Sequence, residues 1–163
     1  MSDWPTVEEL ARQERELRWP GFDEDDAWRL GAALVREARG RDLPVAVDIT
    51  RGEHQLFHAA LPGSAPDNDA WLRRKARVVA RFHHSSLHVG QLCRDAGRTI
   101  EEMFLVPEGE FAAHGGAFPL TVEGEVLTVD TTFVITGPPR GTNTTGQEAE
   151  GAFCAEVRRE THT

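Results

Sequence analysis

The segment His114-Gly115-Gly116 is the strongest candidate for a binding site in this chain of 163 residues. Two consecutive glycines carry no side chains, so their backbone N–H groups can come close to a bound molecule. The imidazole beside them can act as an acid, a base or a ligand atom near neutral pH. A tight turn, with His114 hydrogen-bonded only for structure, is the competing interpretation. We predict that these three residues contact a small ligand.

Two polar residues, Asp48 and Arg51, are the next candidates for the same ligand. Asp48 lies opposite the apolar residues of a predicted strand, where it would anchor a loop or border a pocket together with Arg51. An enzyme acting on a small substrate would use His114 as its acid or base with one of these two residues. No complete set of nucleophile, base and orienting residue can be assembled. Catalytic residues therefore stay unassigned, and the enzyme hypothesis ranks last.

His84 and His88 have the four-residue spacing with which two imidazoles on one helix face bind a metal ion. A helix that begins at Ser85 or Ser86 would leave His84 outside it, and no acidic residue nearby in the sequence completes a ligand set. We therefore predict no metal site. Haem requires an axial histidine, cysteine or methionine in this chain, because tyrosine is absent. The candidate haem ligands are His54, His58, His88 and His114.

A basic stripe accompanies these candidates. Arg73, Arg77 and Arg81 recur every four residues, with Arg74 and Lys75 beside them. Guanidinium groups suit carboxylate or phosphate ligands. A stripe of this kind more often forms ion pairs or a subunit interface, and we favour that interpretation.

The charge balance excludes several classes of function. The chain has 18 basic and 27 acidic residues and a net charge of −9, whereas nucleic-acid binders and polybasic membrane-surface proteins carry a basic excess. No apolar run approaches the ~20 residues of a transmembrane helix. Cys93 and Cys154 form neither a close pair nor a metal-binding spacing, which favours free thiols and the cytoplasm. We predict a cytoplasmic protein without nucleic-acid or membrane partners.

The elements that must position these residues follow from capping and alternation patterns. The length indicates a single domain over residues 1–163. The helices are expected to begin near Thr6, Asp23, Asp67 or Asn68, Ser85 or Ser86, and Thr99. The strands are expected at residues 45–50, 54–61, 118–122 and 125–136, followed by a divergent tail at 137–163 with a weak or frayed helix over 149–159. This order indicates an α+β fold, a mostly antiparallel sheet with helices on its faces.

Three blocks of sequence carry a resemblance to one known family. They are Asp48-Ile49-Thr50-Arg51-Gly52 with Leu56 to Gly63, then Pro66-Asp67-Asn68 with Trp71 to Lys75 and Arg81 to Ser86, and last Ala113 to Pro119. In this order they resemble the haem-degrading-domain family (HbpS- and GlcG-like), and specifically its uncharacterised single-domain branch. The resemblance covers residues 6–136.

The resemblance implies a profilin-like α/β fold of three layers, α/β/α, with a mostly antiparallel sheet of five strands, in a homo-oligomer. Some relatives in other branches bind haem or iron, so haem is the cofactor it suggests, with the identity of the ligand left open. The chain departs from the family pattern by an extra residue between Gly115 and Pro119, and by its tail. The favoured hypothesis is an oligomeric small-ligand-binding protein. A non-catalytic homo-oligomeric scaffold is the alternative, and a small-molecule enzyme using His114 is the second alternative.

Overall fold

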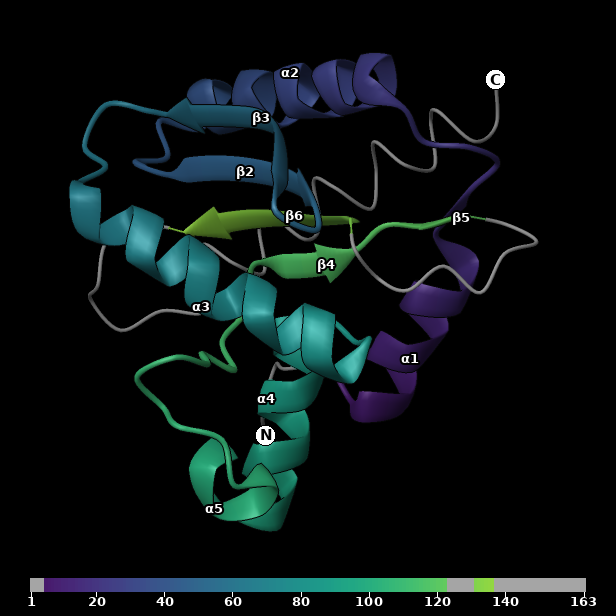
Figure 1. The fold of residues 1–163 in the computed structure, drawn as a ribbon, viewed down its shortest axis with the longest axis vertical. Helices are drawn as coiled ribbons and strands as arrows, with labels where there is room; N and C mark the ends of the chain where they lie inside the picture. Colours follow the sequence, from purple (N-terminus) through teal and green to yellow (C-terminus); the bar gives the residue numbers. More distant parts are fainter. Residues whose placement is uncertain (1–4, 123–130, 137–163) are drawn as a thin grey trace.

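The computed structural model describes residues 5–122 and the strand at 131–136. Helices and strands are mixed along these residues (Figure 1). In chain order they are α1 (Val7–Glu16), β1 (Arg18–Trp19), α2 (Glu24–Gly40), β2 (Ala46–Arg51), β3 (His54–Ala60), α3 (Pro66–Phe82), α4 (Ser86–Ala96), α5 (Ile100–Phe104), β4 (Ala117–Pro119), β5 (Thr121–Val122) and β6 (Thr131–Thr136).

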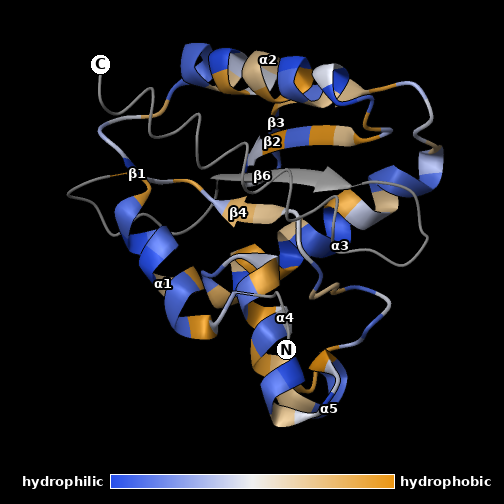
Figure 2. Cartoon of the chain, turned by 180° about the vertical axis from the view of Figure 1, so that it is seen from behind, coloured by the Kyte–Doolittle hydropathy of each residue, from blue (hydrophilic) through white to orange (hydrophobic). Residues whose placement is uncertain are grey.

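Four helices begin where the capping patterns predict. The N-caps of α1, α2, α4 and α5 are Thr6, Asp23, Ser85 and Thr99. Each of these side chains accepts a hydrogen bond from the backbone N–H three residues later, which satisfies a donor that the helix start leaves free. Helix α1 is largely hydrophilic (Figure 2), and Leu10 is its buried residue. Local sequence therefore sets these helix starts.

Helix α3 begins earlier than the sequence indicated. Asp67 or Asn68 was the expected N-cap, but the helix starts at Pro66 with Ala65 in the cap position. The fixed φ of proline suits the first helical residue, which moves the start forward. The side chain of Asn68 still has a capping role, because its Oδ1 accepts a hydrogen bond of 2.6 Å from the Ala65 N–H.

The main sheet of the described residues has four strands in the order β3-β2-β6-β4, all antiparallel to their neighbours. The predicted hairpin of β2 and β3 is confirmed, with Asp48 opposite His58. The five-stranded sheet that the resemblance implied is not seen in this part of the chain. Strand β4 ends at Pro119, which has no N–H to continue the ladder. The chain then forms β5, which pairs in parallel with β1 as a separate two-stranded sheet.

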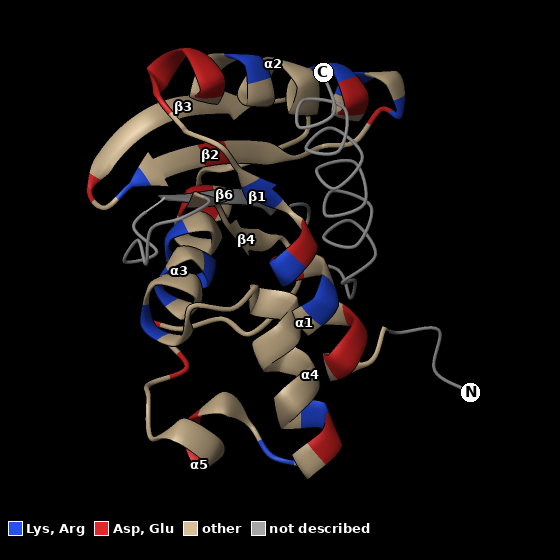
Figure 3. Ribbon diagram, turned by 90° about the vertical axis from the view of Figure 1, so that its right-hand side faces the viewer, with Lys and Arg blue, Asp and Glu red and all other residues tan. Residues whose placement is uncertain are grey.

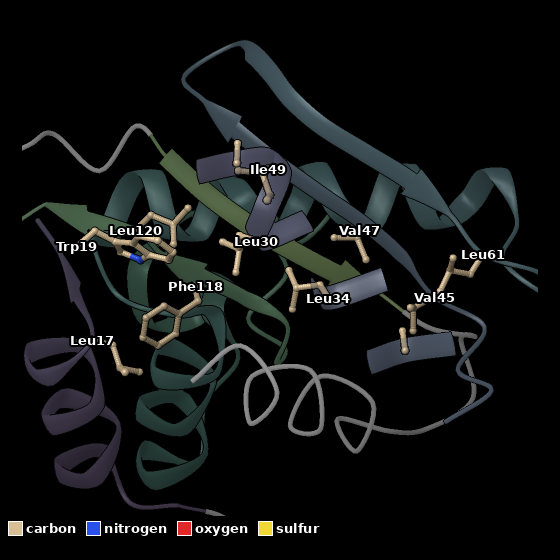
Figure 4. Packing of buried hydrophobic residues seen from close by; sticks show 12 residues of the cluster. Leu17, Trp19, Leu30, Leu34, Val45, Val47, Ile49, Leu61, Phe118 and Leu120 are labelled. Atoms are coloured by element: carbon tan, nitrogen blue, oxygen red, sulfur yellow. The ribbon is translucent and has the colours of Figure 1, made fainter. Parts of the chain in front are cut away.

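Helices cover both faces of the main sheet, so the three layers are confirmed (Figure 1). Alternate residues of a strand point to opposite faces. Val47 and Ile49 of β2 pack against Leu30 and Leu34 of α2, as Figure 4 shows. Ala46 points the other way and packs against α3. The parity of a residue in β2 therefore decides which helix it meets.

Helices α4 and α5 form a separate apolar cluster with the end of α3. The buried members of this cluster are Val78, Val89, Cys93, Ile100 and Val106. A Cβ atom at Gly90 would lie 2.3 Å from the carbonyl oxygen of Ala113. The absence of a side chain at Gly90 thus lets the loop after α5 lie directly on α4, and this loop carries His114.

The remaining predictions fall on residues that the structure does not describe. They are the first half of the strand at 125–136, the tail at 137–163 and the helix at 149–159. Among the described helices, none is long and apolar enough to cross a membrane.

Candidate functional site

His114 lies at the end of the loop between α5 and β4, where it meets helix α3. Its ring is 5.9 Å from the ring of Trp71, centroid to centroid, and tilted by 59°. The residue is exposed, whereas the six residues that follow it are buried. His114 is therefore the last residue of this loop that a ligand can reach before the chain enters the core.

The surroundings of His114 are positively charged. Although the residue as a whole is exposed, neighbouring atoms partly desolvate its ring, and this lowers the pKa of His114 below the usual value. The charges of Lys75, Arg74 and Arg94 lower the pKa further. Glu108 acts in the opposite direction. The lowered pKa favours the neutral imidazole, which has a lone pair on one nitrogen.

A cavity of about 430 Å³ opens beside His114. We call it the His114 cavity; it lies between α4, α5 and the loop that leads to His114. Its charged lining residues are Arg74, Arg94, Arg98, Glu102 and Glu108, and its apolar wall includes Ile100 and Phe111. This volume falls within the range of roughly 300–1,000 Å³ of small-molecule sites, which combine apolar walls with a few polar groups.

Arg74 is the most unusual group of the cavity lining. Its guanidinium carbon lies 4.3 Å from the centre of the Trp71 ring, and its Nη2 donates a hydrogen bond to the carbonyl oxygen of Glu108. Its Nε is buried and has no hydrogen-bond partner among the described residues. An unsatisfied buried donor costs about 1–3 kcal/mol of stability.

The two predicted glycines have a structural role next to the cavity. Gly115 and Gly116 are both buried, and neither is among the residues that line the His114 cavity. Gly116 has a φ of 130°, which side-chain-bearing residues rarely adopt. Directly after it, the Ala117 N–H donates a hydrogen bond of 3.0 Å to the Ser86 hydroxyl. The pair therefore turns the chain into β4, and contact with a ligand stays a prediction for both glycines.

Asp48 belongs to a polar network on the α3 side of the sheet. Its Oδ1 accepts a hydrogen bond of 2.8 Å from Gln55 and lies 3.3 Å from Nδ1 of His58. The other nitrogen of His58 lies 3.7 Å from Oδ1 of Asp69, at the start of α3. Burial raises the pKa of Asp48 despite these hydrogen bonds.

Arg51 lies on the opposite side of the sheet. Its Nη1 is 3.6 Å from a carboxylate oxygen of Glu24, and its Nη2 donates to the carbonyl oxygen of Phe22, both near the start of α2. Asp48 and Arg51 therefore border no common pocket among the described residues, because residues three apart in a strand point to opposite faces. Contact of either residue with a ligand stays a prediction. The structure gives each residue partners other than His114, so it does not assemble the acid–base set of the enzyme hypothesis.

A second histidine site combines Glu14 of α1 with His84 and His88, and we call it the Glu14 cluster. Nδ1 of His84 lies 2.7 Å from Oε2 of Glu14, and Nδ1 of His88 lies 3.2 Å from Oε1. The Ser85 N–H donates a hydrogen bond of 2.8 Å to the same Oε1. The two imidazoles are stacked, with ring centroids 4.0 Å apart.

The contacts within the Glu14 cluster shift the pKa values of its members in opposite directions. Burial acts to raise the pKa of Glu14, but hydrogen bonds from the two imidazoles and from Ser85 outweigh burial and lower the pKa to about 2. The hydrogen bond to Glu14 raises the pKa of His84. Figure 3 shows α1 and α4 side by side, which is how a residue 70 positions away in the sequence reaches His84.

A family model described as haem degrading protein HbpS-like matches residues 22–129. The chain belongs to this family. The UPF0303 protein of Streptomyces avermitilis is 56% identical over 136 residues, which are 83% of this chain and 82% of the relative. The crystal structure of the Ybr137w protein has a TM-score of 0.84 at 30% identity and covers 98% of this chain and 91% of its own. The crystal structure of a PduOC:Heme complex has a TM-score of 0.64 at 16% identity, over 83% and 94% of the two chains, and shares the fold.

The HbpS-like match includes the His114 cavity but not Glu14. The sequence singled out His114, His84 and His88, yet it missed Arg74 as a partner of His114 and Glu14 as a partner of the other two. A signal for Arg74 was present, since it follows Trp71 by three residues on one helix face. No local pattern could have identified Glu14, because its contacts join two distant helices.

Proposed function

We propose that this protein binds a planar anionic small molecule of the haem type in the His114 cavity. The observation that carries the proposal is an imidazole next to several guanidinium groups on the wall of one open cavity. The lowered pKa of His114 favours its neutral form. An axial ligand must offer a lone pair, which a neutral imidazole does. Carboxylate groups of the ligand would pair with the arginines.

The residues present fit a haem by their chemistry. His114 would hold the iron, Arg94 and Arg98 would meet the propionates, and Ile100 and Phe111 would contact the ring. When bound, haem supplies a redox-active iron with an axial position for an imidazole.

Family membership supports the same ligand class. The family model is described by haem degradation, and the structural neighbour PduOC was crystallised with haem. Neither relative fixes the ligand of this chain, so the proposal depends on the cavity itself.

Titration of the untagged full chain with haemin tests the proposal. We expect a shift of the Soret band that saturates near one haemin per chain. The shift should be lost in His114→Ala and retained in His54→Ala, which removes an exposed histidine of β3 as a matched control. An unsaturable response, or the same saturable shift in His114→Ala, would overturn the proposal.

We also propose that the chain forms a homo-oligomer, as the family resemblance implied. Two large apolar side chains of the described surface are exposed, Trp28 by 67% and Leu105 by 89%. Trp28 lies on α2 and makes an edge contact with Phe57 of β3. Aromatic residues are enriched at the centres of interfaces. Light scattering should give a mass above one chain that falls in Trp28→Glu; a monomer at all concentrations would contradict this proposal and the scaffold alternative with it.

A further inference from the structure

We propose that the Glu14 cluster is a binding site for a divalent transition metal of the zinc type, separate from the His114 cavity. The site combines one carboxylate and two imidazoles, and one donor atom of each residue lies within 4.8 Å of the others. Three donors that converge in this way match the zinc sites in which two histidines and one glutamate leave a fourth position for water.

The geometry already directs the donors to a common point. Both imidazoles turn Nδ1 toward the same carboxylate, at 2.7 and 3.2 Å, and the two rings are stacked within 29° of parallel. Zinc binds nitrogen and oxygen donors at about 2.0–2.2 Å. An ion between the three side chains would take the place of the N–H protons that now link them. A doubly protonated imidazole would release its Nδ1 proton to solvent, and a neutral imidazole would keep its one proton on Nε2.

Hydrogen bonds of Ser85 hold the Glu14 carboxylate in place. The backbone N–H of Ser85 donates a hydrogen bond to Oε1 of Glu14. The Ser85 hydroxyl in turn accepts a hydrogen bond of 3.1 Å from the backbone N–H of His88. Partners of this kind orient metal ligands and raise their affinity. Ser85 is also the N-cap of α4, so the residue that begins the helix holds the Glu14 carboxylate as well.

Exposure of the three residues differs in a way that suits metal entry. The side chains of His88 and Glu14 are 6% and 11% exposed, whereas that of His84 is 43% exposed. The buried pair fixes the position of the ion, and the His84 side leaves the fourth coordination position open to water. Mixed imidazole and carboxylate donors favour zinc or iron(II) over magnesium or calcium, which prefer oxygen donors alone.

Titration of the chelator-treated, untagged full chain with Zn²⁺ by calorimetry tests this site. We expect saturation at one ion per chain. Loss of a residue that hydrogen-bonds to a metal ligand weakens metal affinity by about 10–100-fold. Loss of a ligand itself, in His84→Ala or Glu14→Gln, should weaken the zinc affinity at least as much. His83→Asn is the matched control, because it removes the neighbouring imidazole while asparagine tolerates the φ of 58° at that position.

Two further measurements keep the test decisive. Circular dichroism establishes that His84→Ala is folded, which we expect because this side chain is partly exposed. Cobalt(II) then reports the ligands directly, through visible absorption bands of a four-coordinate site that disappear in His84→Ala. Absence of saturable zinc binding, or equal affinity in His84→Ala and the native chain, would overturn the proposal. His114→Ala should bind zinc as the native chain does, so failure of the haemin experiment leaves this result unaffected.

Discussion

The His114 cavity and the Glu14 cluster contain the same side chain in opposite electrostatic surroundings. His114 is close to Lys75, Arg74 and Arg94, and these charges add to burial in lowering its pKa. His84 contacts the carboxylate of Glu14, and its pKa is raised. The comparison teaches that the neighbours of a histidine, rather than its place in a motif, decide in which direction its pKa moves.

Helix α4 separates the two sites and contributes to both. Its first turn carries His88, which meets Glu14 of α1. Its later residues Gly90, Cys93 and Arg94 line the His114 cavity. Figure 3 shows α1 running beside α4, whereas α5 lies at the far end of α4. A change to one end of this helix should therefore affect one site more than the other, and the following experiments use that expectation.

Removal of the shared carboxylate should have the largest effect. Glu14→Ala leaves two imidazoles and the Ser85 N–H without their acceptor. Hydrogen bonds to a charged group contribute about 1.5–3 kcal/mol each, and with partial recovery by water we expect a loss of about 2–3 kcal/mol in the free energy of unfolding. Urea unfolding of metal-free protein measures it.

Glu16→Ala is the control for this substitution. Glu16 ends the same helix, and its exposed carboxylate lies 4.0 Å from Arg12. Exposed pairs contribute about 0–1 kcal/mol, so the control should change stability far less. Equal losses in the two variants would contradict a special contribution of the Glu14 cluster.

A methyl group at the other end of α4 should disturb the His114 cavity alone. In Gly90→Ala the new Cβ meets the carbonyl oxygen of Ala113 at 2.3 Å, so the loop that carries His114 must move. Overpacking costs about 1–3 kcal/mol, and the better helix propensity of alanine returns about 1 kcal/mol. We expect a net loss of up to about 2 kcal/mol in the free energy of unfolding and weaker haemin binding, with zinc binding unchanged.

The control is Gly40→Ala at the end of α2, where an added Cβ has nothing within 4 Å. This variant should be at least as stable as the native chain. If Gly90→Ala also behaves in this way and binds haemin normally, the loop does not depend on its contact with α4.

These two ends of α4 also show what the sequence could and could not predict. The sequence indicates helix starts near Thr6, Asp23, Thr99 and either Ser85 or Ser86, because a cap depends on three or four neighbouring residues. The hairpin of β2 and β3 followed from alternation in the same way. Both features are local, and both are confirmed.

Features that depend on the packing of distant elements were missed. The sequence indicated His84 and His88 but ruled out a ligand set, because Glu14 reaches them only when α1 packs on α4. Asp48 and Arg51 were combined because they are close in sequence, although their parity in β2 sends them to opposite faces. Parity was available from the sequence, whereas the packing of α1 was not.

Removal of the Arg74 charge should reduce the difference in pKa between His114 and His84, with a smaller effect on the protein than the substitutions above. The pKa of His114 lies below its usual value of 6.5, partly through Arg74, so Arg74→Gln should move it upward. Proton NMR of the imidazole, recorded against pH on ligand-free protein, measures the change. Arg73→Gln, an exposed neighbour on α3, is the control and should move the His114 pKa less. Haemin binding should accordingly fail as the pH decreases through the His114 pKa, because a protonated imidazole has no lone pair for iron.

Asp48 provides the smallest effect and the sharpest contrast with Glu14. Both carboxylates contact an imidazole, yet the pKa of Asp48 is raised because burial outweighs its bonds to Gln55 and His58. An acid whose folded pKa exceeds its unfolded value stabilises the fold at low pH and loses that contribution as the pH rises through the folded pKa. In Asp48→Asn this loss is absent, so the native chain should lose stability relative to the variant between pH 3 and pH 7. Urea unfolding across this range measures the difference in stability, with Asp42→Asn as a surface control. The opposite result is a native chain that gains stability relative to Asp48→Asn as the pH rises. It would show that the contact with His58 favours the ionised carboxylate more than burial disfavours it.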